Sequence, residues 1–291
     1  MAVARAGGFR DGAKALGTSP SHVSEAIRRL EARLQVRLFN RTTRSVAPTD
    51  AARGLIERLE PALREVKDAL DVVNTYRQRP AGTLRLNVPV SVSRLVLPGI
   101  VPGFLKAYPE IRLDVVTDEN FVDVLAGGFH AGIRYEERLE QDMIAVPIGP
   151  RVQRFALAAS PDYLEQHGRP AHPRELMSHT CLRARFPSGA MVTWELVRGG
   201  EVVRLDPPSA LLVTAGGGTD LAIDAAIAGL GIVGIFEAWL RPHLQSGVLE
   251  PVLADWWPSF SGPFLYYSGR RLVPAPLRAF IDYIKAVPPA S

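Results

Sequence analysis

The first 49 residues contain a helix, a tight turn, a second helix and a basic hairpin, in an order that few folds can accommodate. Gly17-Thr18 supplies the turn, and Ser19 followed by Pro20 starts the second helix, because serine caps free N–H groups and proline lacks the first of them. Apolar residues at helical spacing would form the buried faces of the two helices: Ala13, Leu16, Val23, Ile27, Leu30 and Leu34. This order predicts a winged helix-turn-helix.

The outward face of the second helix is polar and basic. Short hydroxyl and imidazole groups near a helix N-terminus can approach DNA base edges, while arginines reach guanine or phosphate. The candidate contacts on this helix are Ser21, His22, Ser24, Arg28 and Arg29. After Leu38-Phe39, residues 40–46 alternate like two short strands around a polar tip. The candidate phosphate anchors on that hairpin are Arg41, Thr42 and Arg44.

Positive charge is concentrated in the same segment. Residues 1–49 hold 9 Lys/Arg against 3 Asp/Glu, a net of +6, whereas residues 81–291 hold 19 against 21, a net of −2. Such a distribution is typical of a nucleic-acid-binding region. An ordinary solvated pair of basic helices is the alternative, and the cap, turn and hairpin together favour binding to double-stranded DNA.

Composition bounds the rest of the chain. At 291 residues it exceeds one typical domain, and 47% hydrophobic residues can form sizeable cores. Apolar runs fall short of the roughly 18 residues that span a membrane, and the N-terminus lacks a signal peptide's apolar core, so we expect a cytoplasmic protein without membrane partners. Cys181 is the only cysteine. It excludes an internal disulfide, and an inert buried thiol is a better interpretation than a redox sensor.

A long helix should run from Thr49-Asp50 to about residue 76, roughly 40 Å. Its apolar residues are separated by alternating steps of four and three: Leu55, Leu59, Ala62, Val66, Ala69 and Val73, with Leu63 and Leu70 alongside. This seam predicts pairing with a second copy of the chain, although a helix lying on its own domain would show the same stripe. Pro61 should cause a mild bend. A dimer would present two copies of the second helix, so its DNA target would be an interrupted inverted repeat.

The remainder of the chain alternates strands and helices after a polar break at residues 77–82. Strands are predicted at 84–88, 111–116, 131–135, 155–159, 211–214, 232–236 and 264–267. Helices are predicted at 98–107, 120–126, after Pro161, near 219–228 and at 276–286. This alternation predicts an α/β arrangement with mainly parallel sheets in two lobes, which leave a cleft where ligands commonly bind.

Several polar residues fall at the ends of these strands, where α/β sheets bind ligands. Ser91 and Ser93 lie between the first strand and its helix, where they either contact an anion or simply cap the helix. Thr117 and Arg134 follow the second and third strands. Arg134 is placed to pair either with a carboxylate ligand or with Glu136 or Asp142. Weaker candidates are Phe186, Thr214 and Phe236.

No pattern supports catalysis, a cofactor or a metal site. The glycines of Gly229-Leu230-Gly231-Ile232-Val233-Gly234 follow a helix and enter a strand, the reverse of the order that binds a dinucleotide. His167, His172 and His179 lie in or beside turns without the spacing of metal ligands, so solvated positions are favoured. No serine lies in a nucleophile elbow. We therefore expect a chain that is not an enzyme.

Four stretches resemble LysR-type transcriptional regulators, in that family's order and at about its spacing. They are AKALGTSPSHVSEAIRRLEARLQVRLFNRTTRSVAPT, LRLNVPVSVSRLVLPGIVPGFLKAYPEIRLDVV, ASPDYLEQHGRP and AAIAGLGIVGI. The resemblance implies a winged helix-turn-helix in residues 1–49, a dimerising linker helix and hinge in 50–80, and a two-lobed effector domain like periplasmic binding proteins in 81–291. Lobe 1 would hold about 81–153 and 259–291, and lobe 2 about 154–258. In this family the turn carrying Ser91 and Ser93 commonly lines the effector pocket.

The chain departs from the family pattern in three places. The family usually has a longer first helix where this chain starts at Met1, so we expect either that the apolar surface under that helix is exposed or that the first helix is truncated at this start. Pro20 stands where a glutamine is common, and His130 replaces a usual aspartate. The implied function is a dimeric or tetrameric DNA-binding regulator controlled by a small anionic effector. The alternative is a stand-alone small-molecule-binding protein or an enzyme, with a decayed DNA-binding segment.

Overall fold

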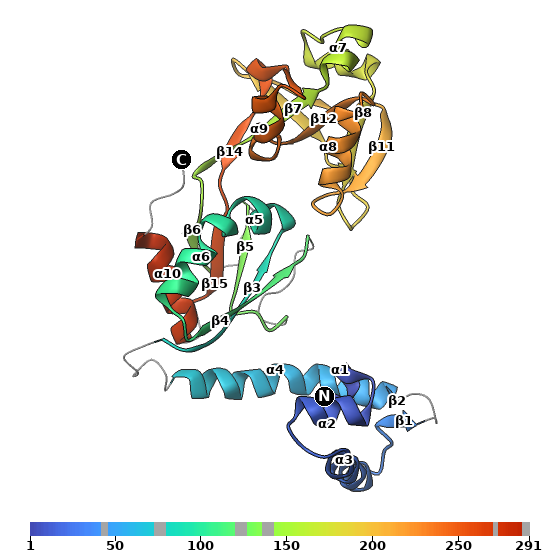
Figure 1. Cartoon of the computed structure of the whole chain (residues 1–291), viewed down its shortest axis with the longest axis vertical. Coiled ribbons are helices and arrows are strands. Elements are labelled where there is room, and N and C mark those ends of the chain that lie inside the picture. Colours follow the sequence, from blue (N-terminus) through green and yellow to red (C-terminus); the bar gives the residue numbers. More distant parts are fainter. Residues whose placement is uncertain (42–45, 73–79, 120–126, 136–142, 270–272, 287–291) are drawn as a thin grey trace. The chain divides into compact units, whose positions relative to one another are not determined.

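A computed structural model describes the chain except for residues 42–45, 73–79, 120–126, 136–142, 270–272 and 287–291 (Figure 1). The chain forms two compact units, Met1–Leu70 and Asp71–Ser291. Within the described residues, no single helix is long and apolar enough to cross a membrane; only a pair bent by 53°, Val90–Gly99 with Val101–Ala107, reaches that length and composition.

The first unit contains the predicted helices and hairpin. Its elements are α1 (Ala2–Ala6), α2 (Phe9–Ala15), α3 (Pro20–Leu34), β1 (Phe39–Arg41), β2 (Val46–Pro48) and α4 (Asp50–Val72). The buried core comprises Val3, Ala13, Val23, Leu38, Phe39 and Ala52. A Cβ on Gly12 would lie only 2.9 Å from the Val3 Cα atom, so the glycine permits the close approach of α1 to α2. The short α1 covers part of the apolar surface with Val3, which is 2% exposed, while Leu16 at 59% and Leu34 at 41% are exposed instead of contributing to the predicted buried faces.

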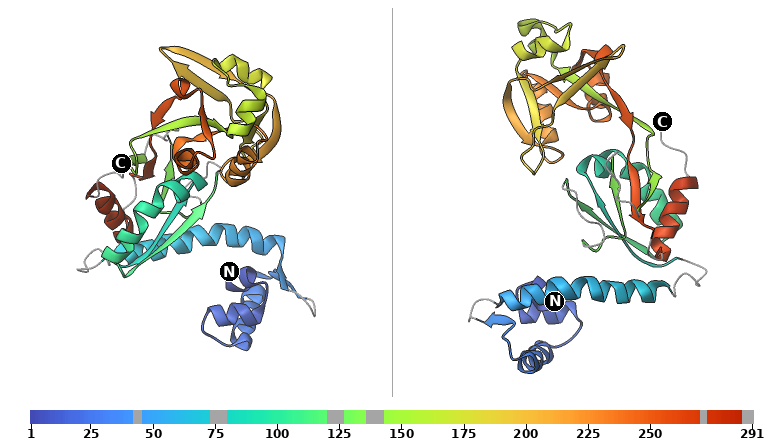
Figure 2. Two further views of the ribbon diagram at one scale, coloured as in Figure 1. Left: turned by 45° about the horizontal axis from the view of Figure 1, so that its top comes forward. Right: turned by 180° about the vertical axis from the view of Figure 1, so that it is seen from behind.

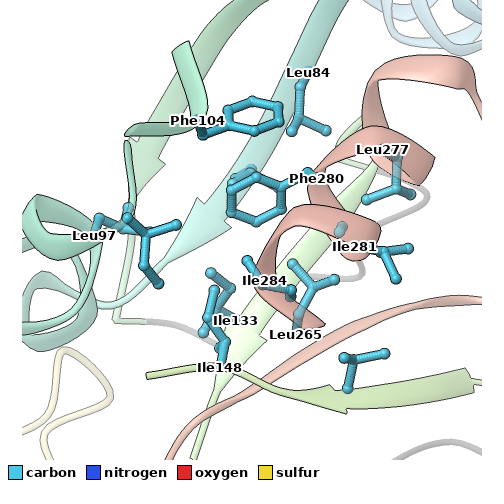
Figure 3. Close-up of a cluster of buried hydrophobic side chains, with 14 of the residues drawn as sticks. Leu84, Leu97, Phe104, Ile133, Ile148, Leu265, Leu277, Phe280, Ile281 and Ile284 are labelled. Atoms are coloured by element: carbon cyan, nitrogen blue, oxygen red, sulfur yellow. The ribbon is translucent and has the colours of Figure 1, made fainter. Parts of the chain in front are cut away.

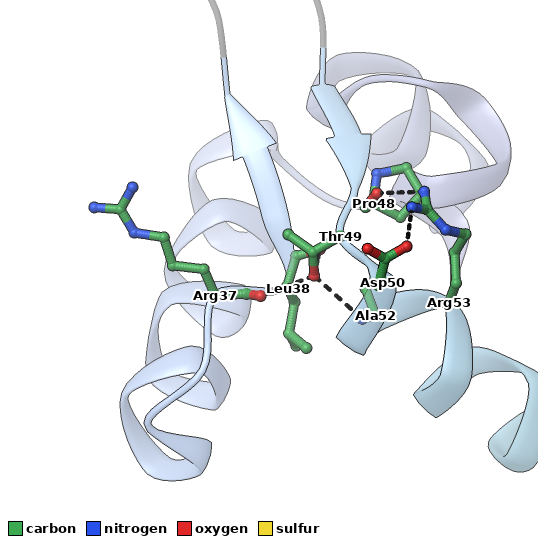
Figure 4. A network of polar contacts seen from close by, with 7 residues as sticks. All are labelled: Arg37, Leu38, Pro48, Thr49, Asp50, Ala52 and Arg53. Atoms are coloured by element: carbon green, nitrogen blue, oxygen red, sulfur yellow. Dashed lines mark hydrogen bonds and ion pairs between the residues drawn. The ribbon is translucent and has the colours of Figure 1, made fainter.

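Thr49 joins the hairpin to α4 (Figure 4). Its hydroxyl accepts a hydrogen bond from the Ala52 N–H at 3.2 Å and donates to the Arg37 carbonyl oxygen at 2.9 Å. The Thr49 N–H also donates to the Leu38 carbonyl oxygen, at 2.9 Å. Beside it, Arg53 is paired with Asp50 and donates to the Pro48 carbonyl oxygen at 2.8 Å. These bonds fix the start of α4 against the hairpin, as the sequence predicted for Thr49-Asp50.

Helix α4 continues through Pro61 to Val72, and residues 73–76 of the predicted helix lie outside the described residues. Within the seam, Leu59 is 40% exposed and Val66 is 58% exposed, with Leu63 beside them at 53%. Leu55, the first residue of the seam, is not part of this exposed face, because it packs against the core of the first unit. The exposed face of α4 therefore carries an apolar stripe formed by Leu59, Leu63 and Val66.

Lobe 1 of the second unit is built on a five-stranded sheet in the order β4-β3-β5-β15-β6 (Figure 1). The strands are β3 (Gly82–Val88), β4 (Ile111–Thr117), β5 (Ala131–Arg134), β6 (Met143–Pro147) and β15 (Phe264–Ser268), and the helices are α5 (Val90–Leu95), α6 (Val101–Ala107) and α10 (Ala275–Ala286). Phe280 of α10 meets Phe104 of α6 edge to face, with ring centroids 4.9 Å apart (Figure 3). This aromatic contact ties the C-terminal helix to the lobe formed by the first strands.

Lobe 2 is built on a six-stranded sheet, β11-β8-β12-β7-β13 with β14 paired to β7. Its strands are β7 (Val152–Ala159), β8 (Cys181–Arg185), β11 (Ser209–Thr214), β12 (Ile232–Phe236), β13 (Glu250–Val252) and β14 (Ser259–Ser261), with a separate hairpin of β9 (Trp194–Arg198) and β10 (Glu201–Leu205). The helices are α7 (Pro161–His167), α8 (Thr219–Ile227) and α9 (Glu237–Ser246). Leu157 and Ala159 of β7 join one core, and Ala156 and Ala158 the other, so both faces of the sheet are covered.

The prediction of mainly parallel sheets is wrong. In each lobe two strand pairings are parallel, and the pairings that involve β7 or β15 are antiparallel. The chain enters lobe 2 through β7 and returns from it through β14 to β15, where β14 pairs antiparallel with β7 (Figure 2). The chain crosses between the lobes at β7 and again at β14 and β15. In each lobe the crossing strand, β7 or β15, runs antiparallel to the strands beside it.

Several elements were not predicted, among them the helix α1 and the strands β6, β8, β13 and β14. Residues 90–95 form the short helix α5, whereas the sequence had been interpreted as a turn there. The hairpin of β9 and β10 and the helix α9, which begins directly after β12, were also missed. Other predicted elements match within a few residues, and the predicted helix at 120–126 lies outside the described residues.

Candidate DNA interface and effector cavity

Helices α2 and α3 form the helix-turn-helix of the first unit. Gly17 adopts a φ of 63°, a left-handed conformation that glycine tolerates well, and it reverses the chain between the helices. The Ser19 hydroxyl accepts a hydrogen bond from the His22 N–H at 3.2 Å, and Pro20 is the first helical residue. The start of α3 is therefore fixed as the sequence predicted.

The outward face of α3 presents most of the predicted DNA contacts. Ser21, His22, Arg28 and Arg29 are exposed and Ser24 is half-buried, while Val23 points into the core. Arg28 donates to Glu25 one turn away at 3.3 Å, and its side chain remains 67% exposed. A contact this exposed is weak, so the guanidinium can exchange its partner for a base or a phosphate.

The hairpin is attached to α3 by Glu31, a residue that the sequence analysis did not single out. One Glu31 carboxylate oxygen accepts hydrogen bonds from the N–H groups of Leu38 at 2.8 Å and Phe39 at 3.1 Å. The backbone of Arg41 pairs with Val46 across the hairpin. Thr42 and Arg44 lie outside the described residues.

The second unit contains a cavity of about 360 Å³. Residues of both lobes line it: Pro89, Ser91, Glu119, Arg134, Tyr135, Phe155, Ala184, Phe186, Val192, Ala215, Gly216, Thr219, Gly234, Ile235, Phe236, Trp239 and Phe260. The volume falls within the range of about 300–1,000 Å³ that is usual for small-molecule sites.

Four of the seven predicted effector contacts meet in this cavity: Ser91, Arg134, Phe186 and Phe236. The other three lie elsewhere. Ser93 is half-buried on α5, and Thr117 and Thr214 are exposed at the ends of β4 and β11. Several lining residues were not predicted from the sequence, although Tyr135 directly follows Arg134 at the end of a predicted strand: Glu119, Tyr135, Phe155, Trp239 and Phe260.

Arg134 is held by oxygens of the chain itself. It is 5% exposed, and one terminal nitrogen donates to the carbonyl oxygens of Ile133 at 2.7 Å and Asn87 at 3.3 Å. The other donates to the Asn87 side-chain oxygen and to the Asp118 carbonyl oxygen at 3.3 Å. The guanidinium therefore joins β3, β4 and β5 at the edge of the cavity. The alternative partners Glu136 and Asp142 lie outside the described residues.

Tyr135 lies at the boundary between the lobes. Burial raises the pKa of its hydroxyl, and Glu119 raises this pKa further, against the opposite effect of hydrogen bonds with Ser91 and Gln153. The Gln153 amide donates to the hydroxyl oxygen at 3.4 Å from β7. Tyr135 therefore stays neutral in this cavity, which disfavours an ionised oxygen.

Arg94 connects the two lobes beside the cavity. From α5 it forms an ion pair with Asp220 of α8, and its guanidinium lies 5.0 Å from the ring centre of Trp239 in α9. The hydrogen bond from Arg94 is the main cause of a lowered pKa of Asp220, and the Trp239 indole N–H also donates to that carboxylate, at 3.3 Å. This contact holds α5 close to α8 and α9.

The histidines near Cys181 form a packed cluster in lobe 2. His167 stacks on Tyr163 with ring centres 4.4 Å apart, and the Tyr163 hydroxyl lies 3.3 Å from His179 Nδ1. Cys181 is buried, and burial raises the pKa of its thiol to about 12. No group of His, Cys, Asp and Glu within the described residues is arranged to hold a metal ion. His179 is buried, where the sequence favoured a solvated position, whereas His167 is exposed as predicted.

Comparison with known proteins covers both units. Residues 1–53 match the model of the bacterial regulatory helix-turn-helix protein, lysR family, and residues 77–288 match that of the LysR substrate binding domain. The transcriptional regulator YcaN of Escherichia coli is 39% identical over 98% of this chain and 92% of its own, and PgrR of the same organism is 34% identical over 98% and 94%.

Solved structures of full-length regulators share the fold. CrgA of Neisseria meningitidis, a LysR-type transcriptional regulator, aligns over 97% of this chain and 94% of its own, with a TM-score of 0.60 and 28% identity. The Vibrio cholerae virulence activator AphB aligns over 98% and 96%, with a TM-score of 0.67 and 24% identity. The chain therefore belongs to the LysR family of DNA-binding transcriptional regulators, with an N-terminal helix-turn-helix and a C-terminal effector-binding domain.

Proposed function

We propose that α3 is the helix that reads DNA sequence in the major groove. The observation that carries this proposal is the exposed polar and basic face of a helix whose start is capped and whose opposite face is buried. Its contacts would be Ser21, His22, Ser24, Arg28 and Arg29. The first turn is the part of a recognition helix that usually approaches base edges, and the two arginines would reach guanine or the backbone.

The hairpin would lie along the phosphates, with Arg41, Thr42 and Arg44 as the anchors. The Glu31 bonds to Leu38 and Phe39 support this proposal, because they fix the base of the hairpin to the recognition helix. Contacts of this kind set affinity and position without reading sequence.

Helix α4 would pair two chains through the exposed residues Leu59, Leu63 and Val66. Apolar side chains on an open helix face favour association, and the four-three spacing suits a helix pair. The resulting dimer, or a tetramer of two dimers, would bind an interrupted inverted repeat in double-stranded DNA. On this proposal residues 1–49 contact DNA, residues 50–80 dimerise and connect, and residues 81–291 sense the effector.

The effector would bind in the cavity, with Ser91, Arg134, Phe186 and Phe236 among the lining residues that it meets. Both lobes supply the lining, so a ligand there can favour one arrangement of the lobes over another. It can change DNA binding only by the difference in its affinity for the two arrangements.

Two arginine variants test the DNA contacts. Arg41→Ala should reduce the slope of log affinity against log salt by about one unit, and Arg28→Ala should also relax sequence preference at one position of the site. Titrations of operator DNA followed by fluorescence anisotropy, at several salt concentrations, measure both effects. Arg112→Ala, an exposed arginine of lobe 1, removes the same charge and should leave the slope unchanged. An unchanged slope in Arg41→Ala would remove the hairpin from the proposal.

A further inference from the structure

Among the residues that the structure describes, six aromatic rings line the cavity. They belong to Tyr135, Phe155, Phe186, Phe236, Trp239 and Phe260. Three of them form one cluster: the ring centre of Phe236 lies 5.1 Å from that of Tyr135 and 5.4 Å from that of Phe260. Tyr135 follows a lobe 1 strand, Phe236 ends a lobe 2 strand, and Phe260 belongs to the returning strand β14. Tilted rings of this kind form an apolar wall that suits a flat aromatic guest.

Arg134, a positively charged residue that lines the cavity, already donates hydrogen bonds to oxygens of the chain. Both terminal nitrogens of Arg134 donate to oxygens of Ile133, Asn87 and Asp118. Each terminal nitrogen carries two hydrogens, and each has two acceptors within the chain. A carboxylate ligand that binds the two terminal nitrogens would therefore have to displace hydrogen bonds that join three strands.

Glu119 also lines the cavity and brings a carboxylate to it. The Glu119 carboxylate accepts a hydrogen bond from the Val90 N–H at 2.8 Å. Gly216, from lobe 2, lies close to it, since a Cβ there would be 2.2 Å from a Glu119 carboxylate oxygen. A negative charge at this place disfavours an anionic ligand; burial is the main cause of the raised pKa of Tyr135, and Glu119 adds to it.

The cavity also limits the size and the polarity of the ligand that it can hold. Its volume of about 360 Å³ exceeds the roughly 150 Å³ that encloses a benzene molecule, so it can hold one or two fused rings. Ser91 and Thr219 are the buried hydroxyl residues of the lining, at 8% and 3% exposed. They can serve one hydroxyl or carbonyl group of a ligand.

We propose that the effector is an uncharged, flat aromatic compound of one or two fused rings with a single hydroxyl or carbonyl group. This inference rests on the proposed role of the cavity as the effector site. It replaces the anionic effector that the sequence suggested, because the terminal nitrogens of the lining arginine are engaged and the Glu119 carboxylate also lines the cavity. A ligand against Tyr135, Phe236 and Phe260 would also touch both lobes and the strand that connects them.

Calorimetric titration of the full-length chain with four matched probes tests the ligand class. The probes are naphthol, naphthoate, naphthylmethylammonium and decahydronaphthol, which vary charge and aromaticity at nearly constant size. At neutral pH, naphthol should bind at least about tenfold more tightly than either charged probe, and about threefold to tenfold more tightly than the saturated alcohol. The inference is overturned if naphthoate binds best, if the saturated alcohol equals naphthol, or if none of the four binds.

Variants locate the binding in this cavity. Phe260→Leu should weaken naphthol binding about threefold to tenfold, whereas Tyr108→Leu, which changes a half-buried aromatic outside the lining, should not. Glu119→Gln keeps an acceptor for the Val90 N–H, so it should strengthen naphthoate binding and leave naphthol binding nearly unchanged. Equal effects of Phe260→Leu and Tyr108→Leu would place the probe elsewhere and overturn the inference. Circular dichroism confirms that each variant is folded.

Operator binding measured on the same samples separates this inference from the proposed function. If the chain binds DNA but none of the probes, the ligand class is wrong and the regulator remains. If naphthol binds in the cavity but the chain discriminates no DNA sequence, the proposed DNA role fails while the ligand class stands.

Discussion

At the residue scale, Arg134 shows what the sequence could and could not indicate. Its place at the end of a strand correctly predicted that it would lie at the cavity, but not that the surrounding carbonyl oxygens would use its donors. Those carbonyls come from β3, from β5 and from the residue that follows β4, and strand order becomes visible only in the folded sheet. The same limit applies to Phe260, whose sequence neighbourhood carries no ligand motif and whose ring reaches the cavity through the pairing of β14 with β7.

Replacing Arg134 by methionine should destabilise the protein rather than merely weaken ligand binding. The substitution leaves buried acceptors on Asn87 and Ile133 without a donor, at a cost of about 2–5 kcal/mol in the free energy of unfolding. Urea denaturation of the full-length chain measures the loss. The exposed Arg112→Met is the matched control and should change stability by less than about 0.5 kcal/mol. Unaltered stability of Arg134→Met would show that the arginine serves the ligand instead of the sheet.

At the element scale, short-range patterns predicted the helices better than the strands. Ser19-Pro20 and Ser160-Pro161 each marked a helix start, and both serines accept the expected N–H bond. The helix α5 was missed because its six residues, VSVSRL, alternate like a strand and carry no capping side chain. Packing of Val92 into the core of lobe 1 stabilises it there.

The Thr49 side chain should matter to α4 more than its surface position suggests. Thr49→Ala removes the acceptor for the Ala52 N–H and the donor to the Arg37 carbonyl, and should reduce the free energy of unfolding of the first unit by about 1 kcal/mol. Thr49→Ser keeps both bonds and should retain most of the stability. Hydrogen exchange at the Ala52 amide would report the loss locally; equal protection in the two variants would contradict this role.

The seam of α4 gives a prediction about assembly. Val66→Glu places a charge on the exposed apolar stripe and should shift the chain from dimer toward monomer, with an increase of about tenfold or more in the dimer dissociation constant. Glu57→Lys changes a charge on another face of the same helix and should leave association intact. Sedimentation equilibrium compares the two. If both variants associate like the unmodified chain, α4 is not the dimer interface.

At the scale of the whole molecule, the fold class followed from the sequence because it depends on the order of elements, which local patterns reveal. The resemblance indicated that residues 259–291 return to lobe 1, but the place of β15 between β5 and β6 did not follow from the sequence, since these pairings join residues more than a hundred positions apart. The returning strand β14 and the helix α9 contribute Phe260 and Trp239 to the cavity, and neither element was predicted from a local pattern. Family resemblance therefore pointed to the turn that carries Ser91, and only the structure showed the aromatic lining of the cavity there.

The central claim is that two copies of this chain bind an inverted repeat through α3 and the hairpin. The most direct test titrates the full-length chain against the DNA that flanks its own gene, and against the same fragment with one half-site scrambled. We predict two chains per intact fragment and an affinity at least about 100-fold lower for the scrambled one. Equal affinity for both fragments, or a single bound chain on the intact one, would contradict the account.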